Sequence, residues 1–142
     1  MKVQYLGDSK DSFKWDYHDW LASEMNYGRL TVALMLTPDD GGGHGQTKAE
    51  TFPARTTVLQ FCRELRERRD IECIKQLPAH TGGSYDLALH KNAERPLIRT
   101  EYFTGFDASA AQIVFLDPDN GFEPERSCNE AHVAYQDVEQ CR

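Results

Sequence analysis

Two short apolar runs dominate the hydrophobic pattern of the chain. They are LTVALML at Leu30–Leu36 and AQIVFL at Ala111–Leu116. Each run is apolar at nearly every position, and turn-forming residues such as Gly28, Pro38 and Pro118 bound them. Short continuous apolar runs are typical of strands buried on both faces, as in parallel sheets. The pattern therefore predicts two central strands of a parallel sheet.

Three segments have apolar residues at helical spacing, and the clearest of them is Thr56–Arg69. The others are Ser12–Met25, with Asp11 or Ser12 as its cap and Gly28 beyond its end, and the tail Asn129–Cys141. On the clearest helix, Arg63–Glu67 and Glu64–Arg68 are expected to form ion pairs one turn apart. The stripes expected to face inward are Val58, Phe61, Cys62 and Leu65 on that helix, Phe13, Tyr17, Trp20, Leu21 and Glu24 on the N-terminal helix, and Ala134, Val138 and Cys141 on the tail.

The remaining segments carry weaker patterns. Val3–Leu6 is expected to be a short strand or an extended lead-in, and Ile71–Ile74 a short strand. Pro78–Ser84 is expected to be a turn, and Tyr85–His90 alternates like a half-buried strand. Leu97–Phe103 fits a strand or a helix. The stretch at 37–54 contains four glycines in five positions, so it is expected to be a mobile loop.

Strands that alternate with helices predict an α/β fold, Rossmann-like, with a mainly parallel sheet flanked by helices. The length of 142 residues fits one domain. The chain stops after a helix, where a doubly wound sheet would normally add another strand. We therefore expect either a minimal or truncated fold, or a homodimer in which a second copy completes the sheet edge.

Composition narrows the classes of function. The net charge of −7 argues against a protein that coats nucleic acid, because such affinity comes mostly from Lys and Arg. No apolar run approaches the roughly 20 residues of a membrane span, and the charged start lacks a signal-peptide core. Four cysteines without a Cys-x-x-Cys pair favour reduced thiols in a cytoplasmic protein, with Cys62 in the core.

Acidic residues follow both apolar runs. Asp39 and Asp40 follow the first; the second leads into Asp117, Asp119 and Asn120, with Glu123 close behind. Because ligands of open α/β sheets bind at the carboxyl ends of the strands, we expect these side chains to share a cleft.

The residues Asp117, Asp119, Asn120 and Glu123 leave several interpretations open. Asp117, Asp119 and Glu123, with Asp40 as a further candidate, could offer oxygen ligands to Mg²⁺ or Mn²⁺. The group could also hydrogen-bond an amino group on a nucleobase. Asp-Pro and Asn-Gly are strong turn formers, so a plain turn is the structural alternative.

A second constellation, Gly7-Asp8-x-x-Asp11-x-x-Lys14, lies at the start of the N-terminal helix. Gly7 permits a close backbone approach, while Asp11 and Lys14 lie one helical turn apart. As alternatives, Asp8 or Asp11 could be a helix cap and Lys14 a solvated side chain. His44 is expected to be an ordinary loop histidine, and neither a nucleophile elbow nor a phosphate-binding loop motif occurs.

Three segments carry a family resemblance. YLGDSKDSFKWDYHDWLA, LTVALMLTPDDG and VFLDPDNGFEP resemble a group of bacterial and phage proteins of unassigned function, in order and spacing. More remotely, the layout resembles S-adenosylmethionine-dependent adenine methyltransferases of ribosomal RNA. Those open with Gly-Asn-x-x-Asp-x-x-Lys-His and carry Asp-Pro-Pro-Tyr after a central strand.

The resemblance implies that Asp117 accepts a hydrogen bond from the target amine. It implies that the cofactor or substrate lies near Gly7, Asp8, Asp11, Lys14 and Asp40. The chain departs from the catalytic pattern at Asp119 and Asn120, where those enzymes have Pro and Tyr.

Three functions stay open from the sequence. The first is methyl transfer from S-adenosylmethionine to an amine of a nucleic acid or nucleotide. The second is a Mg²⁺-dependent nuclease or phosphohydrolase that uses Asp117, Asp119 and Glu123. The third is a phage or host binding module without catalysis.

Overall fold

The structure is a computed structural model that describes residues 1–43, 45–90, 99–103 and 113–141. Three parallel strands form its sheet, in the order β2-β1-β3: β1 (Arg29–Ala33), β2 (Asp86–Leu89) and β3 (Ile113–Leu116). Leu30 of β1 lies opposite Leu87 of β2 and Ile113 of β3. The predicted α/β fold with a parallel sheet is confirmed, and both apolar runs supply neighbouring strands.

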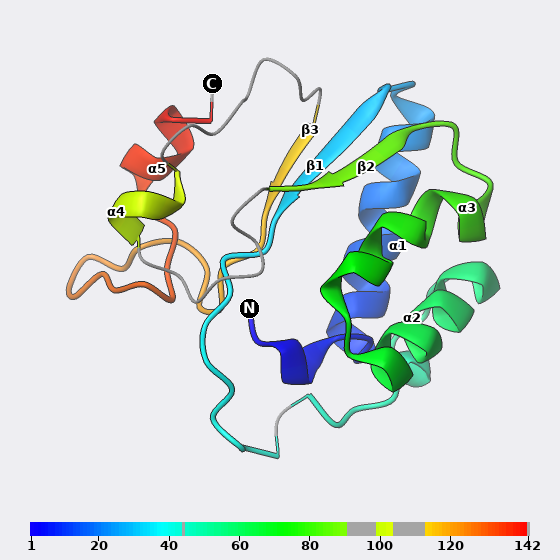
Figure 1. Cartoon of the computed structure of the whole chain (residues 1–142), viewed down its shortest axis with the longest axis horizontal. Helices are drawn as coiled ribbons and strands as arrows, with labels where there is room; N and C mark the ends of the chain where they lie inside the picture. Colours follow the sequence, from blue (N-terminus) through cyan, green and yellow to red (C-terminus); the bar gives the residue numbers. More distant parts are fainter. Residues whose placement is uncertain (44, 91–98, 104–112, 142) are drawn as a thin grey trace.

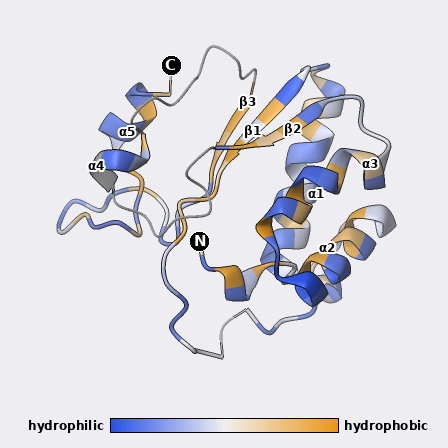
Figure 2. Ribbon diagram, viewed as in Figure 1, coloured by the Kyte–Doolittle hydropathy of each residue, from blue (hydrophilic) through white to orange (hydrophobic). Residues whose placement is uncertain are grey.

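Helices lie on both faces of the sheet (Figure 1). On one face lie α1 (Ser9–Glu24), α2 (Thr56–Arg68) and α3 (Leu77–Thr81); on the other lie the short α4 (Arg99–Tyr102) and α5 (Tyr135–Glu139). Figure 2 shows that the strands between the two helical layers are largely hydrophobic. Among the described residues, no helix is long and apolar enough to cross a bilayer.

Strand β1 and the residues directly after it contribute side chains to two hydrophobic cores, one on each face of the sheet. Side chains alternate between the faces of a strand. Leu30, Val32 and Leu34 accordingly belong to the larger core with α1 and α2. Ala33 and Met35 belong to a smaller core with Tyr102, Phe103 and Val133.

Helix α2 matches its sequence pattern. All four residues of its expected inward stripe are buried: Val58, Phe61, Cys62 and Leu65. The expected ion pairs along the helix do not form, because Arg63 pairs with Glu50 and Glu64 faces His80 instead. Tertiary partners therefore replace the i,i+4 pairs.

Helix α1 begins earlier than expected, and the face that was expected to be buried is exposed to solvent. Its cap is Asp8, whose side chain accepts hydrogen bonds from the backbone N–H groups of Lys10 and Asp11, and the helix ends before Asn26, which takes a left-handed conformation. The expected inward stripe was wrong: Phe13, Tyr17 and Trp20 are 62%, 47% and 51% exposed. The buried residues of α1 are Ser9, Asp11, Ser12, Trp15, Asp19 and Ala22.

Several short segments also differ from expectation. Val3–Tyr5 is a 3₁₀ turn rather than a strand. Ile71–Gln76 is also 3₁₀, because the Asp70 side chain accepts the Glu72 N–H at 2.9 Å and starts a helical turn that runs into α3. The tail is helical only in α5, and residues 97–98 and 111–112 of two expected elements lie outside the described residues.

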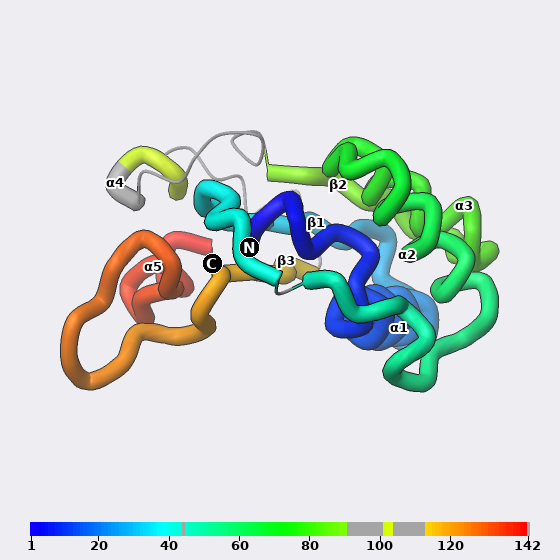
Figure 3. The backbone as a smooth tube through the Cα atoms, turned by 90° about the horizontal axis from the view of Figure 1, so that it is seen from below, coloured from blue at the N-terminus to red at the C-terminus, as the bar shows by residue number. Residues whose placement is uncertain are grey.

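The loop after β1 contains one regular element, a 3₁₀ turn at Ala49–Thr51. It leads to α2 on one face of the sheet, whereas the chain after β3 leads to α5 on the other. The point between β1 and β3 is therefore a topological switch point, where open α/β sheets bind ligands. Figure 3 shows the N-terminal segment (dark blue) crossing this end of the strands, between the loop after β1 and the segment after β3.

Candidate functional site

A cleft of about 630 Å³ opens at the carboxyl ends of β1 and β3. The N-terminal segment, the first turns of α1, the glycine-rich loop and the segment after β3 surround it. Its lining includes most of the expected site residues, namely Asp8, Asp11, Lys14, Asp117, Asp119 and Asn120. Two aromatic side chains, Tyr5 and Phe52, also line the cleft.

Asp117 lies directly after β3, where the sheet fixes its backbone. Its N–H donates to the carbonyl oxygen of Ala33 at 2.9 Å and extends the pairing between β1 and β3. The residue is only 7% exposed. Both of its carboxylate oxygens accept hydrogen bonds from Lys14 Nζ, at 2.9 and 3.2 Å.

Lys14 connects Asp117 to a second buried carboxylate, that of Asp11. Lys14 Nζ lies 2.8 Å from Asp11 Oδ1, while Asp11 Oδ2 accepts the Gly7 N–H at 2.8 Å. Gly7 has a φ of +74°, and a β-carbon there would collide with the carbonyl oxygen of Cys62 in α2. Glycine is therefore required at this position, and it fixes Asp11 against the turn before α1. We call Asp11, Lys14 and Asp117 the lysine triad.

Burial and charge pull the pKa values of the triad in opposite directions. Burial raises the pKa of Asp117 above its usual range, although Lys14 partly offsets the shift. Burial alone would lower the pKa of Lys14, but the carboxylates of Asp11 and Asp117 outweigh it and raise that pKa. Lys14 is therefore a permanent cation near neutral pH and serves as a hydrogen-bond donor, not as a base. Burial also raises the pKa of Asp8, the helix cap.

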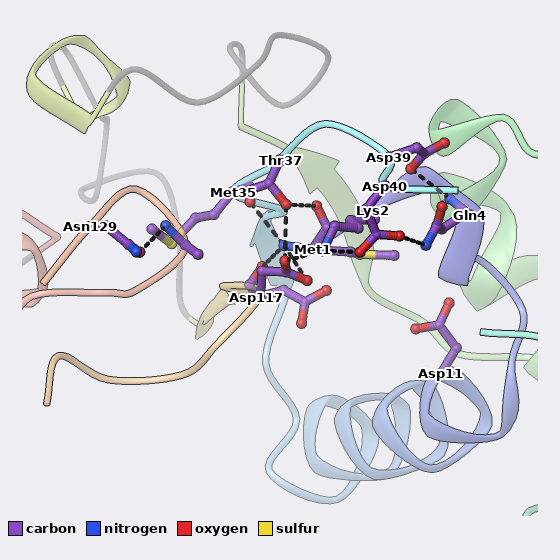
Figure 4. A network of polar contacts seen from close by, with 12 residues as sticks. Met1, Lys2, Gln4, Asp11, Met35, Thr37, Asp39, Asp40, Asp117 and Asn129 are labelled. Atoms are coloured by element: carbon purple, nitrogen blue, oxygen red, sulfur yellow. Dashed lines mark hydrogen bonds and ion pairs between the residues drawn. The ribbon is translucent and has the colours of Figure 1, made fainter. Parts of the chain in front are cut away.

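A second ionic network joins the ends of the two strands (Figure 4). Lys2 Nζ lies 2.7 Å from Asp119 Oδ2 and 3.3 Å from Asp40 Oδ2. Thr37 Oγ1 also donates to Asp119 Oδ2, at 3.1 Å, and Gln4 Nε2 donates to Asp40 Oδ1 at 2.8 Å. The acidic residues that follow β1 and β3 therefore meet, as the predicted parallel arrangement requires.

These contacts keep both carboxylates of this network ionised. Burial would raise the pKa of Asp119, but Lys2, the N-terminal ammonium and Thr37 lower it overall. The Gly42 N–H, Gln4 and Lys2 lower the pKa of Asp40 to about 2. The amino group of Met1 donates to the Met35 carbonyl at 2.9 Å, beside the same network.

Of the expected site residues, Gly7, Asp40 and Glu123 do not line the cleft, and neither does Asp39, which was expected to share it. Asn120 lines the cleft and is exposed, and its N–H donates to the Ala131 carbonyl. Glu123 does not line the cleft, since its Oε1 accepts the Tyr135 N–H at the start of α5, at 2.9 Å. In the described part of the chain, no three His, Cys, Asp or Glu side chains are arranged to hold a metal ion.

The lining of the cleft combines aromatic and acidic groups. Tyr5 and Phe52 contribute aromatic rings, with Lys2 Nζ 5.6 Å from the centroid of the Tyr5 ring, and the acidic side chains offer hydrogen-bond acceptors. Lys2, Lys10 and Lys14 stand against Asp8, Asp11, Asp117 and Asp119, so the charges of the lining nearly balance. These features favour a small ligand that carries groups of both charges and an aromatic ring.

Sequence reasoning missed Lys2, Tyr5, Thr37 and Phe52 as parts of the site. Lys2 and Asp119 lie 117 positions apart, so no local spacing joins them. The one sequence feature that relates to Tyr5 is the glycine at position 45, which packs directly against the Tyr5 ring where a β-carbon would collide. This relation can be recognised only from the structure. His44, in the same loop, lies outside the described residues.

Comparison with known proteins gives no family, relative or fold neighbour: no family model, no curated protein and no solved structure matches this chain significantly.

Proposed function

We propose that this protein transfers a methyl group from S-adenosylmethionine to an amine of a nucleotide or nucleic acid, with Asp117 as the residue that positions the amine. One observation carries the proposal. A buried carboxylate, held by a lysine, faces a cleft at the topological switch point of the sheet. The motif resemblance assigns the same residue the same role.

The geometry of Asp117 suits an acceptor that must stay in place. Lys14 contacts both carboxylate oxygens, which restrains rotation of the side chain. Each ionised oxygen has further lone-pair positions, so Asp117 retains capacity for an N–H donor from a ligand. Positioning of this kind lowers a reaction barrier by holding the reacting atoms in line.

When bound, S-adenosylmethionine would supply an electrophilic methyl group on a positively charged sulfur. Asp117 would orient the amine so that its nitrogen lone pair faces that methyl carbon. Transfer would form the nitrogen–carbon bond at the amine that Asp117 holds while the carbon–sulfur bond breaks, and the electrons of the broken bond would stay on sulfur. The amine then loses one proton, for which Asp117 is a suitable first acceptor because burial raises its pKa.

The rings of Tyr5 and Phe52 support a ligand that contains a nucleobase. Phe52 is 46% exposed and lines the cleft, so one face is open to a planar group. Aromatic rings stack on nucleobases with a gain of about 1–3 kcal/mol for each base. A base between these rings would lie in the same cleft as Asp117.

A panel of ligands in a thermal-shift experiment, followed by calorimetric titration, tests the proposal. We expect S-adenosylmethionine and S-adenosylhomocysteine to raise the melting temperature, because a ligand that binds only the folded state stabilises it. Asp117→Asn should keep this shift but lose methyl transfer to adenosine or an adenine oligonucleotide, measured by mass spectrometry.

Asp86→Asn is the matched control, because Asp86 begins β2 and its side chain is 67% exposed and paired with Arg29. It should change neither the shift nor the transfer. A shift with Mg²⁺ or Mn²⁺ alone, lost in Asp117→Asn, would instead support the phosphohydrolase. No shift with any of these ligands would support a binding module without this cofactor.

A further inference from the structure

A second hollow, of about 470 Å³, lies at the Val3–Tyr5 turn, where Val3 and Gln4 line it and Tyr5 lines the main cleft. None of the motifs noted in the sequence includes its basic residues. It is lined by Val3, Gln4, Asp39, Gly41, Gly42, Gln46, Arg66 and Arg69. The last turn of α2 and the residue after it therefore supply its two arginines.

These two arginines, like the exposed Arg68, have no ion pair among the residues that the structure describes, in contrast to Arg55 and Arg63. Arg55 pairs with Asp16 and Asp19, and Arg63 pairs with Glu50. Within the described residues, neither Arg66 nor Arg69 has a carboxylate within 4.0 Å. Positive charges without a carboxylate are unexpected in a chain of net charge −7.

Main-chain carbonyl groups hold both guanidinium groups instead. Arg66 Nη1 and Nη2 donate to the carbonyls of Thr47 and Gln46. Arg69 Nη1 donates to the carbonyls of Gln4 and Leu6, at 2.7 Å each. Carbonyl groups satisfy hydrogen bonds and fix the side chains, but they carry no net charge that would neutralise the arginines.

The positive charges of Arg66 and Arg69 are therefore not neutralised by their hydrogen-bond partners at the hollow. Burial, followed by the neighbouring charge of Arg66, lowers the pKa of Arg69. Asp39 is the one acidic residue of the lining, and its Oδ1 accepts the Gln4 N–H at 3.2 Å. Two arginines against one aspartate leave the lining with a charge of +1.

Donors and space are both available for a ligand. Arg66 Nε, Arg69 Nε and Arg69 Nη2 have no hydrogen-bond partner among the described residues. Gly41 has no side chain, and a β-carbon there would meet nothing within 4 Å. Guanidinium groups bind phosphate oxygens in pairs, and fixed guanidinium groups lose little freedom on binding.

We propose that this hollow binds a phosphate group, with Arg66 and Arg69 as its ligands. The site is independent of methyl transfer, because it uses none of the residues of the lysine triad. The phosphate could be free or belong to a phosphorylated small molecule, and both present the same tetrahedral anion to the arginines. The glycine-rich loop would then lie between two binding sites, since Gly43 and Gly45 line the main cleft while Gly41 and Gly42 line this hollow.

Calorimetric titration at constant ionic strength tests this site with three probes: inorganic phosphate, adenosine monophosphate and adenosine. We expect both phosphate-bearing probes to bind the wild type. Arg66→Gln should weaken phosphate at least about tenfold, the loss of one charge-assisted hydrogen bond. Arg66→Lys should weaken it less, because it keeps the charge but not the paired donors.

Arg63→Gln is the control, because it removes a charge that Glu50 already neutralises on the same helix. It should leave phosphate affinity unchanged. Arg66 is half-buried and its guanidinium group donates only to main-chain carbonyl groups, so its variants should fold, and their circular dichroism and melting temperature verify this. Equal phosphate affinity in Arg66→Gln and the wild type, or no binding of phosphate at millimolar concentration, would overturn the proposal. S-adenosylhomocysteine titrated into the same variants measures binding at the main cleft separately. Its affinity should be the same in the Arg66 variants and the wild type, so a failure of the phosphate site is distinguishable from a failure of the proposed function.

Discussion

Helices α1 and α2 lie on the same face of the sheet, but only α1 buries polar side chains in number. Helix α2 buries Val58, Phe61, Cys62 and Leu65, as its sequence pattern predicts. Helix α1 buries two carboxylates and two serines beside Trp15 and Ala22, while three other aromatic rings are about half exposed, those of Phe13, Tyr17 and Trp20. Hydrophobic burial determines the orientation of α2, whereas specific polar pairing determines that of α1.

Most buried polar groups of α1 have partners supplied by distant parts of the chain, and among the described residues Trp15 Nε1 is an exception without a partner. Asp19 accepts hydrogen bonds from Thr81 Oγ1 at 2.6 Å, Tyr85 Oη at 2.7 Å and Arg55 Nη2 at 2.7 Å. Ser12 Oγ donates to the Ala49 carbonyl, and Asp11 belongs to the lysine triad. Buried polar groups are tolerable when they are paired, so α1 is stable in this orientation because these partners exist. The comparison indicates that α1 serves the site, whereas α2 serves the core.

Removal of a core side chain from α2 should produce the largest effect. Phe61→Ala leaves a cavity in the larger core, where Phe61 is 1% exposed. We expect a loss of about 3–5 kcal/mol in the free energy of unfolding. Urea denaturation measures it, and a loss below about 1 kcal/mol would show that α2 is not packed as described.

Removal of a buried carboxylate from α1 should have the next largest effect. Asp19→Ala leaves the hydroxyls of Thr81 and Tyr85 and the guanidinium of Arg55 without their acceptor. The expected loss is about 1–3 kcal/mol. Asp16→Ala is the control, because Asp16 is more exposed and shares only Arg55, so its loss should be smaller. Equal losses in urea denaturation would contradict the importance of the buried network.

The pH dependence of stability should reveal the role of His18, a half-buried residue of α1. His18 stacks on Phe115, with ring centroids 3.8 Å apart, and its Nδ1 contacts the Lys14 carbonyl oxygen. Burial lowers the pKa of His18, against the Lys14 hydrogen bond and the charge of Asp117, which raise it.

Below a pH of about 6.5 the unfolded chain therefore takes up a proton that folded His18 resists, so stability falls as the pH falls. The drop should be smaller in His18→Asn than in the wild type, measured by urea denaturation at pH 8 and at pH 5. An identical drop in both proteins would rule out a role for His18.

The outward face of α1 should produce the smallest effect on stability. Serine in place of Phe13, Tyr17 and Trp20 removes exposed rings, so each change should alter the free energy of unfolding by less than about 0.5 kcal/mol. Thermal denaturation of the single and triple variants measures this. A loss of several kcal/mol would mean that this face is packed inward, as the sequence pattern predicted.

The sequence sufficed for elements whose residues are set by burial alone. The apolar runs that became β1 and β3, and the stripe on α2, could be predicted because hydrophobic burial follows local spacing. From these two parallel strands the meeting of their acidic ends also followed. The place of Asp117 at this meeting point is therefore predictable from the sequence alone.

The orientation of α1 could not be predicted, because its determinants lie far along the chain. Tyr85 is 66 positions from Asp19, and Asp117 is 103 positions from Lys14. The local spacing of Phe13, Tyr17 and Trp20 predicts that these residues face the core. It contains no information about distant hydrogen-bond partners that favour the opposite orientation of the helix. Similarly, the β-branched residues of Ile71–Ile74 suggested a strand, but the cap at Asp70 and the following Pro78 favour helical turns.

A crystal structure of the protein soaked with S-adenosylhomocysteine tests the central claim most directly. We expect the ligand in the cleft at the carboxyl ends of β1 and β3, with its sulfur facing the carboxylate of Asp117 and its adenine ring against Tyr5 or Phe52. Binding elsewhere on the molecule, or an empty cleft at saturating ligand, would contradict the claim that Asp117 positions an amine for methyl transfer.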